Sequence, residues 1–66
     1  MKVRINDVEH DLAGGSTLAD LARDHIPNSQ WVAVVLDGAV VPRSRWAETG
    51  ISEGSSVEVL TPRQGG

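Results

Sequence analysis

The sequence predicts a single small α+β domain in which one helix packs against a mixed sheet of four or five strands. Three observations lead to this fold class. Short segments of alternating polar and apolar residues occur in both halves of the chain, and a segment between them has helical spacing. The 66 residues include no cysteine, which excludes disulfides and thiolate metal sites. The fold must therefore rest on regular secondary structure and aliphatic packing.

The N-terminal residues predict a β-hairpin. Lys2–Ile5 alternates so that Val3 and Ile5 face inward, which is typical of a half-buried strand. Asn6-Asp7 is turn chemistry, because both residue types tolerate positive φ and bond their own backbone. The segment from Val8 to Leu12 then predicts the return strand.

A short amphipathic helix follows a Gly-Gly break. Thr17 is a good N-cap, and Asp20 three residues later completes a pattern that resembles a capping box. Pro27-Asn28 ends the helical pattern. Four residues at helical spacing form one face of this helix: Leu18, Leu21, Ala22 and His25. We expect His25 to lie at the boundary of that face, with one ring nitrogen exposed to solvent.

The longest apolar run, Trp31–Leu36, predicts a strand that is covered on at least one face and central in its sheet. Asp37-Gly38 is a strong hairpin signal, and Ala39–Val41 is the expected partner strand. If the even-numbered residues of the run face the helix, then Ala33 and Val35 lie on the opposite face of the sheet. There they would join Leu60 in an apolar patch that could bind a partner.

The rest of the chain predicts one turn and one strand. Pro42 stops the preceding strand, and Arg43–Glu48 is expected to form a single helical or 3₁₀ turn that seats Trp46. Glu53-Gly54 predicts a further turn. Ser56–Leu60 alternates as a last strand, with Val57 and Val59 inward.

Composition excludes several function classes. Six basic and nine acidic residues form no run, and the only aromatic residues are two tryptophans, so the basic stripe and stacking platform of a nucleic-acid binder are missing. The longest apolar run is far shorter than the roughly 20 residues that cross a bilayer. No apolar signal segment follows the first residues. We expect a cytoplasmic protein that binds neither nucleic acid nor membrane.

No pattern of catalytic residues is recognisable. The chain has no cysteine nucleophile and no serine in an elbow motif. The cluster Asp7, Glu9, His10 and Asp11 matches no ligand spacing, so we interpret it as solvation of the first turn and expect no metal.

The remaining candidate for a functional group is the C-terminus. Pro62 closes the last strand, so residues 1–62 are the expected domain and residues 63–66 (Arg63, Gln64, Gly65 and Gly66) a flexible tail. A terminal Gly-Gly pair arises by chance roughly one time in a hundred at this glycine content. Residues without Cβ make a thin thread that can enter a narrow channel. The ionised terminal carboxylate is a poor electrophile, so another enzyme must activate it. Without cysteine, any sulfur carried must sit on Gly66.

The chain is similar to the ThiS family of thiamine-biosynthesis sulfur carriers over nearly its whole length. The resemblance implies the ubiquitin-like β-grasp fold, with the first and last strands parallel at the centre of the sheet. The motifs that carry it are Gly15-Ser16-Thr17, Ala33–Gly38, the Val-Pro-Arg-x-x-Trp segment Val41–Trp46, Glu53–Thr61 and the terminal Gly65-Gly66.

The resemblance also implies a reaction cycle in which the chain is a co-substrate and not an enzyme. An adenylating enzyme related to ubiquitin-activating enzymes (ThiF) uses Mg-ATP to adenylate Gly66. Sulfur, usually from a cysteine desulfurase, replaces AMP to give a thiocarboxylate, and thiazole synthase (ThiG) takes that sulfur. ATP and magnesium belong to the partner, and we expect no cofactor on this chain.

Several other functions are compatible with the same residues. The small subunit of molybdopterin synthase has the same fold and thiocarboxylate, although the Val-Pro-Arg-x-x-Trp segment favours thiamine. A carrier for cysteine or natural-product sulfur insertion is a second alternative. The others are a ubiquitin-like protein modifier and an interaction module with an inert tail.

Overall fold

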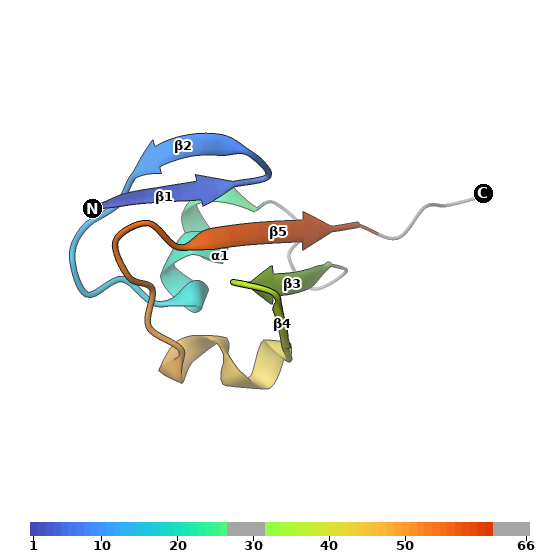
Figure 1. Ribbon diagram of the computed structural model, residues 1–66. Helices are drawn as coiled ribbons and strands as arrows, with labels where there is room; N and C mark the ends of the chain where they lie inside the picture. The colour runs from blue at the N-terminus through green and yellow to red at the C-terminus, as the bar shows by residue number, and fades with distance from the viewer. Residues whose placement is uncertain (27–31, 62–66) are drawn as a thin grey trace.

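The computed structural model describes residues 1–26 and 32–61 (Figure 1). In this part of the chain, five strands form one mixed sheet, helix α1 (Leu18–His25) covers its inner face, and the 3₁₀ helix η2 (Arg43–Glu48) packs beside α1. The predicted α+β class is confirmed. The expected tail, residues 63–66, and its boundary at residue 62 lie outside the described residues.

The N-terminal hairpin forms as predicted. Strand β1 (Lys2–Ile5) pairs antiparallel with β2 (Val8–Asp11), and the first residue of β1 lies opposite the last residue of β2. The turn needs two consecutive residues at positive φ, and Asn6 (49°) and Asp7 (68°) supply them. Strand β2 ends one residue before the expected Leu12, whose N–H still donates to the carbonyl of Met1 over 2.8 Å.

Helix α1 begins with the predicted capping box. The N–H of Asp20 donates to Thr17 Oγ1 over 3.2 Å, and the N–H of Thr17 donates to Asp20 Oδ2 over 3.0 Å. Two of the free N–H groups at the helix start are thereby satisfied. The helix ends at His25, and Ile26 is extended, as expected for a residue before proline.

The second hairpin consists of β3 (Ala33–Leu36) and β4 (Ala39–Val41), joined by the predicted Asp37-Gly38 turn, in which both residues have positive φ. The expected strand from Trp31 is shorter than predicted. Val32 is described outside the strand, and Trp31 lies outside the described residues.

Strand β5 (Ser56–Leu60) is the last in the sequence and lies in the middle of the sheet, whose order is β2-β1-β5-β3-β4. It runs parallel to β1 and antiparallel to β3. The expected parallel pairing of the first and last strands is confirmed, and the topology is that of the ubiquitin-like β-grasp. Strand β3 has neighbours on both sides, but β5 holds the middle position because it separates the two hairpins.

The core lies between the sheet and the two helices. Its side chains include the predicted inward residues of β1 and β5, and Trp46 is seated as expected, with its Nε1–H donating to the carbonyl of Val41 over 2.9 Å. His25, expected at the boundary of the helix face, is exposed, and Ile26 directly after the helix is buried. The buried hydrophobic residues are Val3, Ile5, Leu18, Leu21, Ala22, Ile26, Val34, Trp46, Ile51 and Val57.

The capping box yields a stability prediction. Thr17→Ala removes the side-chain acceptor for the helix N-terminus and should lower the free energy of unfolding by about 1 kcal/mol. For a domain of this size, that corresponds to a fall in Tm of about 4–8 °C. Urea denaturation followed by circular dichroism measures this loss in the free energy of unfolding. Thr17→Ser keeps the hydroxyl and should lose much less, so equal losses for Ala and Ser would assign the effect to the methyl group instead.

Candidate functional site

The chain leaves the sheet from its middle strand. Strand β5 ends at Leu60, and the following residue, Thr61, is exposed. Figure 1 shows this end of β5 on the same side of the molecule as the turn between β1 and β2. The predicted carrier residues Arg63, Gln64, Gly65 and Gly66 lie outside the described residues, so their roles stay predictions.

Beside this exit, the outer face of the sheet carries an apolar surface. Ala33 and Leu60 are direct partners across the β3–β5 pairing, and Leu60 is 54% exposed. Val35 is half-buried and lies two residues along β3, on the same face. The structure therefore brings together the three residues that alternation placed on one face. Their binding role stays a prediction.

Sequence reasoning missed one member of this surface. Val40 lies directly opposite Val35 in the β3–β4 hairpin and is 70% exposed. The two-residue turn at Asp37-Gly38 determines this register, so the signal was available from the sequence. We call Ala33, Val35, Val40 and Leu60 the outer patch. Glu58 pairs with Val35 on its other side and adds one carboxylate to the same face.

The half of the outer face formed by β1 and β2 is charged. Lys2 Nζ lies 3.3 Å from Asp11 Oδ1 in an exposed ion pair, and Arg4 is the cross-strand partner of Glu9. Exposed pairs of this kind add little stability, so their main effect is to make the surface polar. An apolar area bordered by charged residues has the composition of a protein–protein interface.

The acidic and histidine cluster of the first turn does not assemble. Glu9 and Asp11 lie on the outer face, whereas His10 lies on the inner face and contacts His25 of α1 with ring centroids 4.9 Å apart in an edge-on arrangement. Within residues 1–26 and 32–61, no group of three or more histidine, aspartate or glutamate side chains is placed to hold a metal ion.

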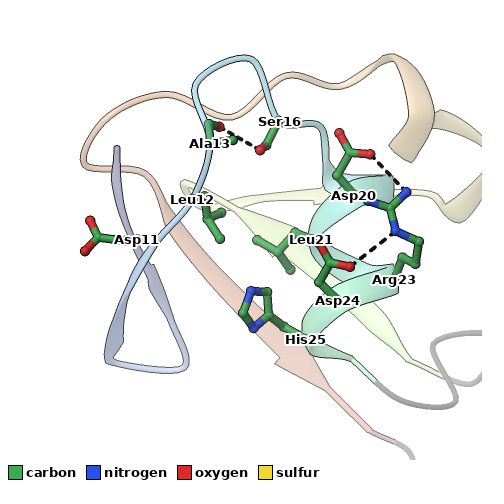
Figure 2. A pocket seen from close by; sticks show the side chains of 9 residues that line it. All are labelled: Asp11, Leu12, Ala13, Ser16, Asp20, Leu21, Arg23, Asp24 and His25. Atoms are coloured by element: carbon green, nitrogen blue, oxygen red, sulfur yellow. Dashed lines mark hydrogen bonds and ion pairs between the residues drawn. The ribbon is translucent and has the colours of Figure 1, made fainter.

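A shallow groove of about 330 Å³ lies between the end of β2 and helix α1 (Figure 2). Its charged side chains bind one another: Arg23 Nη1 is 3.4 Å from Asp20 Oδ1, and Arg23 Nε is 3.3 Å from Asp24 Oδ1. Hydrogen bonding to Asp24 raises the pKa of Arg23. In the described part of the chain, every buried side-chain nitrogen or oxygen has a hydrogen-bond partner. The charged side chains of this groove are therefore paired with one another, as on an ordinary exposed helix surface, and they do not indicate a ligand site.

The family model of the ThiS family matches residues 3–66. The chain belongs to the ThiS family. That match includes the terminal Gly65-Gly66 as well as the sheet. It also confirms the resemblance drawn from the motifs.

Solved structures of ThiS-family proteins have the same fold as this chain. The crystal structure of the thiamine biosynthesis protein ThiS from Geobacter metallireducens superposes with a TM-score of 0.87 at 25% identity and covers all of both chains. A solution structure of a thiamine biosynthesis protein from the same organism gives a TM-score of 0.78 at 26% identity, covering 100% of this chain and 88% of that one. Among curated proteins, none matches this chain significantly by sequence. No helix in the described ranges is long and apolar enough to cross a membrane.

The charge network at the start of α1 predicts a pH dependence. Hydrogen bonding from the Thr17 backbone lowers the pKa of Asp20 in the folded protein, assisted by Arg23 and opposed by desolvation. Ionised Asp20 therefore stabilises the fold above the ordinary pKa of an aspartate, and this contribution is lost as the pH falls through the lowered pKa of the folded state.

The test compares the wild type with Asp20→Asn by urea denaturation from about pH 7 down to about pH 2. The difference in unfolding free energy should be largest near neutral pH and shrink in acid. Asp24→Asn makes the same charge change on the same helix without touching Thr17 and serves as the control. A wild-type advantage over Asp20→Asn that persists unchanged in acid would contradict the assignment.

Proposed function

We propose that this chain is a sulfur carrier of thiamine biosynthesis, in which the carboxylate of Gly66 is converted into a thiocarboxylate. The observation that carries the proposal is the match of the ThiS family model through to the last residue. Two further findings support it. The two solved structures described above are thiamine biosynthesis proteins, and this chain has no cysteine that could hold sulfur on a side chain.

The proposed chemistry needs an activating enzyme of the ThiF kind. A carboxylate oxygen of Gly66 attacks the α-phosphate of Mg-ATP and releases pyrophosphate, which leaves an acyl-adenylate. Sulfur delivered at the oxidation level of sulfide then forms a bond to the acyl carbon, and the bond to AMP breaks. One carboxylate oxygen departs with AMP, and sulfur takes its place. The partner enzyme binds the ATP and the magnesium ion and catalyses the reaction. The carrier is therefore a co-substrate and not an enzyme.

The outer patch is the surface that we propose for docking to the activating enzyme. Leu60 belongs to the patch and is also the last residue of β5, so a partner bound there contacts the place where the tail starts. From Thr61, the five residues of Pro62–Gly66 span at most about 18 Å when extended. A partner that covers the patch would therefore have its activating centre within that distance. After sulfur transfer, an enzyme of the ThiG kind would accept the sulfur for thiazole formation.

The docking proposal is tested by placing a charge in the patch. Val35→Glu and the more exposed Val40→Glu each put a carboxylate where a partner would bury apolar surface, and a desolvated, unpaired charge costs about 2–5 kcal/mol at interfaces. Affinity for the ThiF-like enzyme, measured by calorimetry, should fall at least about tenfold while the circular dichroism spectrum is kept.

Val8→Glu is the matched control, because Val8 is 57% exposed on β2 and its register places it on the inner face, away from the patch. The affinity of the Val8→Glu variant for the enzyme should be close to that of the wild type. Unchanged affinity in both patch variants, with the fold intact, would place the interface elsewhere on the molecule.

The chemical proposal is tested by mass. Incubated with the activating enzyme, Mg-ATP and a sulfur donor, the chain should gain about 16 mass units, the difference between sulfur and oxygen at one carboxylate position. Deleting Gly66 should abolish the gain, because the carboxylate then lies about 3.3 Å short and a displacement of about 1 Å alone can cost a hundredfold in rate. Gly65→Val should impair it strongly by widening the thread.

His10→Ala and His25→Ala are the controls, and each should gain the same mass as the wild type. A mass gain that survives removal of Gly66 would contradict the carrier proposal. So would a product joined instead through an isopeptide bond to Lys2, which would indicate a protein modifier. Supplying a thiazole synthase and a molybdopterin synthase in parallel identifies which acceptor takes the sulfur.

A further inference from the structure

Asn6 lies where β1 leaves the sheet to enter its hairpin turn. The parallel pairing of β1 with β5 ends at Ile5 and Val57, and the backbone N–H of Asn6 adds one more bond, to the carbonyl of Val57 over 2.9 Å. The N–H and carbonyl of Val59, two residues later in β5, point to the same side of the strand. No backbone of β1 extends far enough to pair with them, because the chain has turned away toward β2.

The side chain of Asn6 replaces this missing backbone. The N–H of Val59 donates to Asn6 Oδ1 over 2.8 Å, and Asn6 Nδ2 donates to the carbonyl of Val59 over 3.5 Å. A carboxamide has the same donor and acceptor as a peptide group, so it can extend the hydrogen-bond ladder by one step. On the other side of β5, Leu60 pairs with Ala33. The last two residues of the strand are therefore held from both neighbouring strands.

We propose that Asn6 is a positioning residue for the C-terminal tail: by pairing with Val59 it fixes the point and direction from which the chain leaves the sheet. The inference rests on the proposed function, in which Gly66 must reach the centre of an activating enzyme. If the end of β5 separates from the sheet, it must be ordered again on docking. The apparent affinity then falls with the fraction of molecules whose strand end is in place.

The size of the effect follows from the bond that is lost. A typical net hydrogen bond corresponds to a factor of about 2 to 12 in an equilibrium constant. Because the enzyme-bound tail is in place whether or not Asn6 helps to hold it, the loss should raise the KM for the carrier and leave kcat nearly unchanged.

Asp37 provides a matched control. It has nearly the same positive φ (48°, against 49° at Asn6), also in a hairpin turn, and it also binds β5 through both its backbone and its side chain. The N–H of Ser56 donates to Asp37 Oδ1 over 2.9 Å, and the N–H of Asp37 donates to the carbonyl of Ser56 over 2.8 Å. Ser56 is the first residue of β5, so this contact holds the end of the strand farthest from the tail.

Three variants separate positioning from stability. Asn6→Gly and Asp37→Gly each keep a residue that accepts positive φ, so each loses only the side-chain bonds. Asn6→Asp keeps an oxygen that can accept the N–H of Val59. Amide hydrogen exchange by NMR on the free carrier should show faster exchange of Val59 in Asn6→Gly, faster exchange of Ser56 in Asp37→Gly, and Val59 protection near the wild-type level in Asn6→Asp.

Steady-state adenylation with the activating enzyme is the second measurement. Asn6→Gly should raise the KM for the carrier by a factor of up to about 12 with kcat unchanged, the full factor applying when the strand end is mostly separated from the sheet, whereas Asn6→Asp and Asp37→Gly should stay near the wild type. Two results would overturn the proposal: an equal rise in KM for Asp37→Gly and Asn6→Gly, which indicates general destabilisation, or no change for Asn6→Gly.

The two proposals fail in different ways. A wild-type chain that is never adenylated and never gains sulfur overturns the sulfur-carrier function, and the positioning role with it. A wild-type chain that reacts normally while Asn6→Gly has the same KM overturns only the positioning role. Unchanged Val59 exchange in Asn6→Gly also overturns the positioning role alone, because the proposed clamp would then not be holding the strand.

Discussion

The hydrogen bonding of β5 on both of its edges is the constraint on which the rest of the structure depends. This strand joins two hairpins that otherwise share no strand pairing: β1 pairs with it in parallel, and β3 pairs with it antiparallel. Val57, its second residue, is almost fully buried in the core. The turn of each hairpin then adds a side-chain acceptor, Asn6 near the end of β5 and Asp37 at its start. The sheet is complete only when the last strand of the chain is in place, so its formation relies on contacts between distant parts of the sequence.

The central position of β5 also determines where the chain can act. A terminus that continues an edge strand could be peeled away without disturbing the sheet, whereas this one continues a strand with partners on both sides. The exit at Leu60 is therefore attached to a strand that pairs with a neighbour on each side. A carrier whose terminal group must reach another protein's active site benefits from such an anchor, because a well-positioned origin limits the space that the tail must search.

The small size of the domain explains the character of its outer face. A chain of 66 residues can bury one face of its sheet under a helix, and in the described residues neither α1 nor η2 packs on the other face. That face is apolar over β3, β4 and the end of β5 and charged over β1 and β2. The apolar part includes Leu60 at the exit, so one surface combines an area suited to partner binding with the origin of the tail.

The sequence by itself determined the local elements, and it predicts that the chemistry belongs to the C-terminal carboxylate. Asn6-Asp7, Thr17 with Asp20, and Asp37-Gly38 act on neighbours within a few residues, so turn chemistry and capping predicted both hairpins and the start of the helix correctly. Alternation likewise placed Ala33, Val35 and Leu60 on one face.

The order of the strands came from the family resemblance, because periodicity does not say which strands pair. Only the tertiary structure decided that Asn6 binds Val59, 53 residues away, that Ile26 is buried directly after the helix, and that His10 contacts His25. Each of these depends on residues that the sheet topology brings together from distant positions, and no local pattern records such pairs.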